Sequence, residues 1–127
     1  MLLGCGCSRD PSVDFGKLSE EFVYTTLSFS PSNATAAGLH QYNNQNLDDQ
    51  LDDFSPTALD QQRKFYEDFR NRLGVLKSDS LSAEDRADLT ILDDQISLQL
   101  LDLNEIHNAS HEPQLYVETL GNALFEP

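Results

Sequence analysis

The chain of 127 residues carries 8 lysines and arginines against 22 aspartates and glutamates, which gives a net charge of −14. This length corresponds to one domain or less, and the apolar fraction of 39% is enough for a modest core. A surface of this sign repels nucleic-acid phosphates and anionic lipid headgroups, so we expect no nucleic-acid partner. Imitation of the charge of DNA stays open as an alternative role.

The first seven residues hold both cysteines, Cys5 and Cys7. Residues 2–5 (Leu-Leu-Gly-Cys) resemble the end of a bacterial lipoprotein signal, in which a small residue precedes the cysteine that receives the lipid. Such signals begin with a positive charge and an apolar stretch of about 7–15 residues, whereas only the initial methionine precedes the motif here. We therefore interpret residues 1–13 as a truncated lipoprotein-signal-like start and polar tether, with Cys5 as the candidate lipidation site.

This interpretation predicts a location in the cell envelope or periplasm, with membrane contact only through a lipid on Cys5. A chance match to the signal is the alternative. A disulfide between Cys5 and Cys7 is geometrically awkward, because a single residue separates them. A zinc site would need two further ligands at useful spacing, which the three histidines do not obviously supply.

The first predicted helix spans residues 14–29, because aromatic and apolar residues recur there at intervals of three, four and seven: Phe15, Leu18, Phe22 and Phe29. Ser30 and Pro31 then have the pattern of an N-cap followed by proline in the first helical position. Gly38 is expected to end this short second helix in the left-handed conformation.

The segment 43–53 is expected to be an irregular loop, because it is polar and carries like charges four residues apart. Its four aspartates suggest calcium, but their spacing is not that of an EF-hand loop, so a solvated loop is the better interpretation. Just before it, His40 and Tyr42 form a polar aromatic pair in a loop, and we regard both as candidate pocket-lining residues.

Two further long helices follow. Ser55 and Pro56 repeat the cap-and-proline pattern, and Ser82 begins a third long helix with a relative of the capping box. The apolar stripe of this third helix comprises Leu89, Leu92, Ile96, Leu100 and Leu103, and it is widened by Ile91, Leu98 and Leu101. Two antiparallel helices cover each other on one face only, so we expect surplus apolar surface that needs a further partner. At the end of this stripe, His107 is expected to have a structural or capping role.

After a break at residues 108–113, Leu115, Leu120 and Leu124 indicate the start of a further helix. His111 and Glu112 do not form the zinc motif H-E-x-x-H, since position 115 is leucine and Pro113 opposes the necessary helix. No catalytic and no metal-binding residue is assigned in this chain. The fold class is all-α, with residues 14–127 forming an incomplete N-terminal helical region of three long helices, one short helix and the start of another.

Several segments resemble the N-terminal part of one bacterial family, the domain-of-unknown-function 885 family. The similarity covers residues 14–127 and is carried by residues 18–22 (Leu-Ser-Glu-Glu-Phe), 31–42 (Pro-x-x-Ala-Thr-x-x-Gly-Leu-His-x-Tyr), 81–89 (Leu-Ser-Ala-Glu-Asp-Arg-Ala-Asp-Leu) and 113–116 (Pro-Gln-Leu-Tyr). The resemblance implies a larger, nearly all-helical metallopeptidase-like fold, often secreted or lipid-anchored, with zinc as the cofactor of the full-length protein. The zinc motif of the family lies downstream of the matched region, so the resemblance implies no cofactor site in this chain.

Two functional hypotheses follow. The first is an N-terminal fragment of an exported bacterial protein resembling zinc-dependent, peptidase-like hydrolases, whose partners are a C-terminal catalytic region outside this chain and a peptide substrate. The alternative is a self-contained acidic helical module that binds a partner protein through the apolar surface of residues 89–106.

Overall fold

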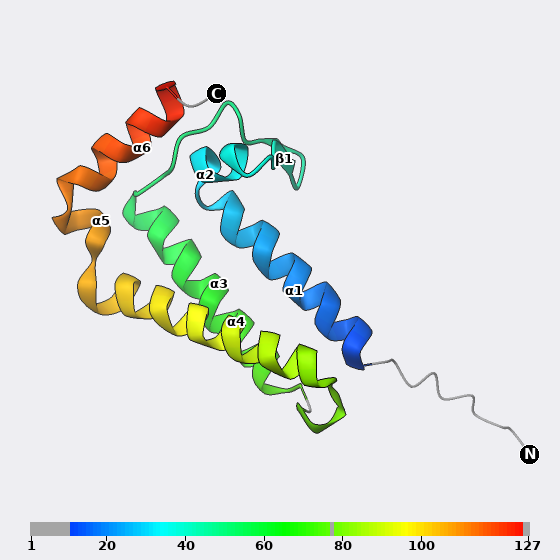
Figure 1. The fold of residues 1–127 in the computed structure, drawn as a ribbon. Helices are drawn as coiled ribbons and strands as arrows, with labels where there is room; N and C mark the ends of the chain where they lie inside the picture. Colours follow the sequence, from blue (N-terminus) through cyan, green and yellow to red (C-terminus); the bar gives the residue numbers. More distant parts are fainter. Residues whose placement is uncertain (1–10, 77, 126–127) are drawn as a thin grey trace, which may run out of the picture.

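The computed structural model describes residues 11–76 and 78–125 (Figure 1). Helices make up nearly all of the regular structure, so the predicted all-α class is confirmed. No helix among these residues has the length and apolar character needed to span a bilayer. The candidate lipidation site Cys5 lies outside the described residues.

The first two helices follow the predicted order. Helix α1 spans Pro11–Ser28 and therefore begins three residues earlier than expected, at a proline, which suits the first turn of a helix. Helix α2 spans Pro31–Ala36, and Gly38 follows it in the left-handed conformation (φ +85°), as predicted. Ser30 is the N-cap residue and Pro31 begins the helix, as predicted, but the Ser30 side chain makes no capping hydrogen bond. The backbone N–H of Ser32 donates to Asp52 instead, and the Ser30 hydroxyl oxygen accepts from the side-chain amide of Asn33.

Part of the predicted irregular loop is a small antiparallel hairpin. Strand β1 (Gln41–Tyr42) pairs with β2 (Gln45–Asn46), and the two turn residues Asn43 and Asn44 both have positive φ, 46° and 62°. This is the backbone geometry of a type I′ turn, which asparagine tolerates better than most residues. The prediction of irregular structure is therefore wrong for residues 43–46.

Both later long helices begin at the predicted caps. Helix α3 spans Pro56–Gly74, and the Ser55 side chain accepts a hydrogen bond from the backbone N–H of Ala58 at 3.2 Å. After a 3₁₀ turn at Ser78–Ser80, helix α4 spans Ala83–Leu101. The Ser82 hydroxyl accepts from the N–H of Asp85 at 3.0 Å. These bonds satisfy N–H groups that have no partner within the helix.

The chain turns sharply after α4. A π-helical turn at Asp102–Ile106 ends at His107, which adopts the left-handed conformation (φ 56°) and donates its backbone N–H to the carbonyl of Asp102 at 2.7 Å. The predicted structural role of His107 at the helix end is thus confirmed. Helices α5 (Asn108–His111) and α6 (Pro113–Phe125) then run back towards α2 (Figure 1).

The core lies where α1, α3 and α4 meet (Figure 1). The Phe22 ring of α1 packs against Phe65, Tyr66 and Phe69 of α3, at centroid distances between 5.1 and 6.2 Å. Helix α4 covers this cluster with three buried side chains of the predicted stripe, Leu92, Ile96 and Leu100, and the π-helical turn after it adds Leu103. Burial of these large apolar side chains contributes most of the favourable free energy of folding.

The three residues that widen the α4 stripe are not covered. Ile91, Leu98 and Leu101 are 58%, 57% and 47% exposed. Helix α6 likewise exposes Val117, Leu120 and Leu124. The predicted surplus of apolar surface is therefore confirmed.

Candidate functional site

A cleft of about 400 Å³ lies between the helical core and the α5–α6 segment. This volume falls within the range of small-molecule and peptide-side-chain pockets. All six α-helices and the π-helical turn contribute to it, together with the α1–α2 connection and the segment before α3. Its lining includes Thr26, Phe29, Ser30, Asn33, Asp52, Phe54, Leu59, Gln62, Tyr66, Gln99, Asp102, Leu103, Ala109, Leu115 and Thr119. Residues distant in sequence are therefore brought to one concave surface.

Two of the four hydroxyl groups in this lining belong to Thr26 and Tyr66. The Thr26 hydroxyl is buried and has no hydrogen-bond partner among the described residues. Tyr66 is only 2% exposed, and burial raises the pKa of its phenol. Buried hydroxyls without partners are rare because desolvation of such a group is unfavourable. A hydrogen-bonding group of a ligand in the cleft would remove this penalty.

The rest of the lining combines amide and apolar side chains. Asn33, Gln62 and Gln99 each carry both a donor and an acceptor. Two carboxylates, Asp52 and Asp102, belong to the lining, and no lysine, arginine or histidine does. Such a surface disfavours anions and suits a neutral or cationic ligand that has both hydrogen-bonding and apolar groups.

Asp52 determines where one edge of the cleft lies. Its carboxylate accepts hydrogen bonds from the hydroxyl of Ser30 at 2.5 Å, and from the backbone N–H and hydroxyl of Ser32 at 3.1 and 2.7 Å. Asp52 thus caps α2 from a distant point in the sequence. A carboxylate is favoured there because the N-terminus of a helix carries partial positive charge.

The opposite wall depends on α6. The Tyr116 ring meets the Phe54 ring edge to face, with centroids 5.1 Å apart, and the Tyr116 hydroxyl donates to the carbonyl of Ala109. Leu115 and Thr119, which flank Tyr116 on the same helix, belong to the cleft lining. Contacts of a single aromatic pair thus help to position the wall.

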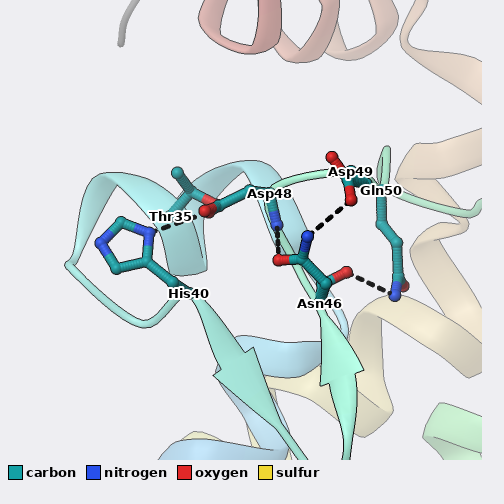
Figure 2. A network of polar contacts seen from close by, with 6 residues as sticks. All are labelled: Thr35, His40, Asn46, Asp48, Asp49 and Gln50. Carbon is teal, nitrogen blue, oxygen red and sulfur yellow. Dashed lines mark hydrogen bonds and ion pairs between the residues drawn. The ribbon is translucent and has the colours of Figure 1, made fainter.

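A second polar network lies beside the cleft, between α2 and the hairpin (Figure 2). Asp48 accepts a hydrogen bond from the hydroxyl of Thr35 at 2.8 Å, and its Oδ1 lies 2.8 Å from Nδ1 of His40. The hydrogen bond from His40, followed by that from Thr35, holds the pKa of Asp48 below its ordinary value of 3.8. Figure 2 also shows Asn46 donating to Asp49 and supporting the backbone of Asp48. This network fixes the hairpin against α2.

The two predicted pocket residues have separate contacts. His40 belongs to the Asp48 network, whereas the Tyr42 hydroxyl lies 2.9 Å from that of Thr25 and its ring stacks on Tyr24 at 6.0 Å. Neither lines the cleft described above. Their role as pocket residues stays a prediction.

The loop carboxylates do not converge on a cation site. Asp48, Asp49 and Asp52 serve the contacts described above, and Asp53 accepts from the backbone N–H of Ser55 at 2.8 Å. Within residues 11–76 and 78–125, no three His, Cys, Asp or Glu side chains are grouped so that they could hold a metal ion. The described residues therefore do not fit a zinc ion, and we assign no catalytic step to them.

Sequence reasoning missed Thr26 and did not assign a site role to Tyr66. Neither residue belongs to a functional sequence motif. The two hydroxyls belong to different helices, so no local pattern brings them together. The Phe54–Tyr116 contact has no sequence signal either, because its partners are more than sixty positions apart.

These features define an all-α protein with a mixed polar and apolar cleft on one side of a three-helix core. Residues 31–125 match the model of a family described as "Bacterial protein of unknown function (DUF885)". The match spans most of the chain, so the chain belongs to this family, as its sequence motifs indicated. No curated protein and no solved structure matches it.

Replacement of Asp52 by alanine is expected to lower the free energy of unfolding by about 1–2 kcal/mol, because the start of α2 loses three hydrogen bonds to a carboxylate. Urea unfolding measures the change. Asp49→Ala is the matched control: Asp49 is exposed and bonds only to the nearby Asn46, so its loss should change stability by less than about 0.5 kcal/mol. Equal effects of the two substitutions would contradict the role assigned to Asp52.

The Asp48 network predicts a pH effect. The pKa of Asp48 is lower in the folded chain than its ordinary value of 3.8, so the network stabilises the fold above pH 3.8. That contribution is lost as the pH falls through the folded-state pKa. Carbon-13 NMR of the Asp48 carboxyl should give a midpoint below 3.8, and His40→Gln should raise it. His111→Gln, which removes a histidine with no contact to Asp48, should leave the midpoint in place, and a wild-type midpoint at or above 3.8 would refute the assignment.

Proposed function

We propose that this chain forms the N-terminal helical wall of a larger exported bacterial hydrolase resembling zinc-dependent peptidases. The cleft between the core and α6 carries the proposal, because it joins hydrogen-bonding and apolar groups on one concave surface. Family membership and the resemblance of the sequence motifs to a metallopeptidase-like fold support it. In this proposal the cleft borders the peptide substrate and contributes binding rather than chemistry.

The lining suits a peptide for a physical reason. An extended peptide presents alternating N–H and C=O groups, and the amides of Gln62 and Gln99 can donate to one and accept from the other. Apolar residues of the lining, such as Phe29 and Leu59, would contact its side chains. The absence of lysine, arginine and histidine from this lining favours neutral or basic peptides over acidic ones.

Zinc belongs to the proposal only through the rest of the enzyme. The metal would polarise the scissile carbonyl or activate water, and its ligands and the general base would come from residues outside this chain. The residues described here bind and orient the substrate beside that centre.

Export is the second part of the proposal, with Cys5 as the lipid attachment site. In cells that produce the protein from its complete gene, a labelled fatty acid should be incorporated into the wild type and not into Cys5→Ser. Cys7→Ser is the matched control and should keep the label. A wild-type protein without label would rule out lipidation.

A second candidate function is a self-contained acidic helical module that binds a partner protein. The observation that favours it is the exposed apolar side of α4, where Ile91, Leu98 and Leu101 are each about half exposed. The hydrolase requires a catalytic region encoded beyond this chain, whereas the binding module does not. Sequencing the gene upstream and downstream of this reading frame therefore distinguishes the two candidates. A downstream region with a His-Glu zinc motif would favour the hydrolase.

The cleft can be tested in the longest chain that the gene encodes, supplied with zinc and a set of neutral and basic peptides. We expect Gln99→Ala to raise KM about tenfold with kcat nearly unchanged, because it removes a contact that is present in both the bound and the transition state. Gln95→Ala is the matched control, since Gln95 lies one turn earlier on α4, is exposed and does not line the cleft.

Two results would contradict the proposal. Absence of zinc-dependent peptide hydrolysis by that chain would remove the hydrolase assignment. Hydrolysis with the same KM for both glutamine variants and the wild type would leave the hydrolase but exclude the cleft as its substrate surface.

A further inference from the structure

The side of α4 that faces away from the core has an apolar stripe of its own. Ile91, Leu98 and Leu101 follow one another at intervals of seven and three, so they lie on one helical face. All three are about half exposed or more. They are opposite the buried stripe that contains Ile96, because residues five positions apart point to nearly opposite sides of an α-helix. We call this surface, with its flanking residues, the outer face of α4.

Carboxylates flank this apolar stripe. Glu84, Asp88 and Asp94 are exposed on the outer face, and Glu105 is exposed in the π-helical turn that follows α4. Their side chains have no hydrogen-bond or ion-pair partner among the described residues. Asp93, by contrast, is turned towards Arg70 of α3 at 3.3 Å. Arg86 is the only basic residue from 83 to 106, a stretch with seven acidic ones. The outer face is thus an apolar stripe within a strongly negative surround.

We propose that the outer face of α4 binds a cationic amphipathic helix of a partner protein. Such a helix would cover Ile91, Leu98 and Leu101 with an apolar face and place lysine or arginine side chains against the flanking carboxylates. Apolar burial supplies affinity, while opposite charges supply orientation and rapid association. The carboxylates that flank the apolar stripe are the reason for expecting a cationic partner.

The same charge pattern argues against other occupants. A second copy of this chain would bring its own acidic outer face, and the chain as a whole carries a net charge of −14. Like charges across an interface repel, and an anionic membrane surface would be repelled for the same reason. The inference rests on the second candidate function and not on the hydrolase, because Ile91, Leu98 and Leu101 do not line the cleft.

A designed helical peptide of about 18 residues, roughly five turns, is a suitable probe, with leucines on one face and lysines beside them. Fluorescence anisotropy with the 127-residue chain should show saturable binding that weakens as salt is raised. Circular dichroism should show the peptide gaining helix on binding. A peptide with the same residues in scrambled order should bind much more weakly.

Variants of the chain localise the binding. Leu98→Gln removes a central apolar contact and Asp94→Asn removes a flanking charge, and each should weaken binding by up to about tenfold. The matched controls are Val75→Gln, at an 80% exposed apolar residue after α3, and Glu67→Gln, at an exposed acid on α3. Neither control should change the affinity. Unfolding curves of all four variants show that they are folded.

Several outcomes would overturn the proposal. The proposal fails if the peptide does not bind, or if the scrambled peptide binds equally well. It also fails if the control substitutions weaken binding as much as the substitutions on the outer face. Sedimentation showing a dimer through this face would assign it to a second copy. Binding by the 127-residue chain but not by the longest chain of the gene would mean that the protein covers this face itself. The peptidase assay of that longest chain is independent of each result.

Discussion

The packing of aromatic rings between α1 and α3 is the interaction on which the rest of this structure depends. Phe22 lies 5.1 Å from Phe69 and 6.2 Å from Phe65, and Phe69 is completely buried. These rings hold two helices that are separated in sequence by α2, the hairpin and a long connection. Because both ends of this intervening segment are fixed by the ring contacts, the segment must lie across one end of the core. The α4 stripe, centred on Ile96, then closes the cluster from the other side.

The cleft follows from that arrangement. Asp52 attaches the connection to the start of α2, and the contact of Phe54 with Tyr116 attaches the same connection to α6. Between these points the hydroxyl of Thr26 belongs to the lining, where burial without a hydrogen-bond partner among the described residues reduces stability. Proteins commonly accept such a penalty at sites that bind a ligand, since local rules are most often broken where function requires it.

The sequence allowed the helices to be predicted because their signals are local. The caps Ser55 and Ser82, the left-handed Gly38 and the buried stripe through Ile96 are all determined by neighbouring residues, and all are confirmed. The failures involve partners that are distant in sequence. Ser30 occupies the N-cap position, but the carboxylate of Asp52, 20 positions after Ser32, accepts the Ser32 N–H that the Ser30 side chain was expected to bind. The cleft could not be predicted for the same reason. Its lining is assembled by packing of several helices, and the apolar periodicity of one helix does not indicate which residues of another helix will lie opposite it.

Hydrogen–deuterium exchange tests most directly whether α1, α3 and α4 form a stable core that supports both the cleft and the outer face of α4. The account predicts slowest exchange for backbone amides of α3 and α4 around Phe69 and Ile96, and intermediate exchange for α1. It predicts faster exchange for α6, whose Tyr116 contacts Phe54 in the connection before α3 rather than the buried core cluster. Uniformly fast exchange in α3 and α4 would contradict the existence of an independent core. Protection of α6 equal to that of α3 would contradict the view that the cleft wall is the weakly attached part of the chain.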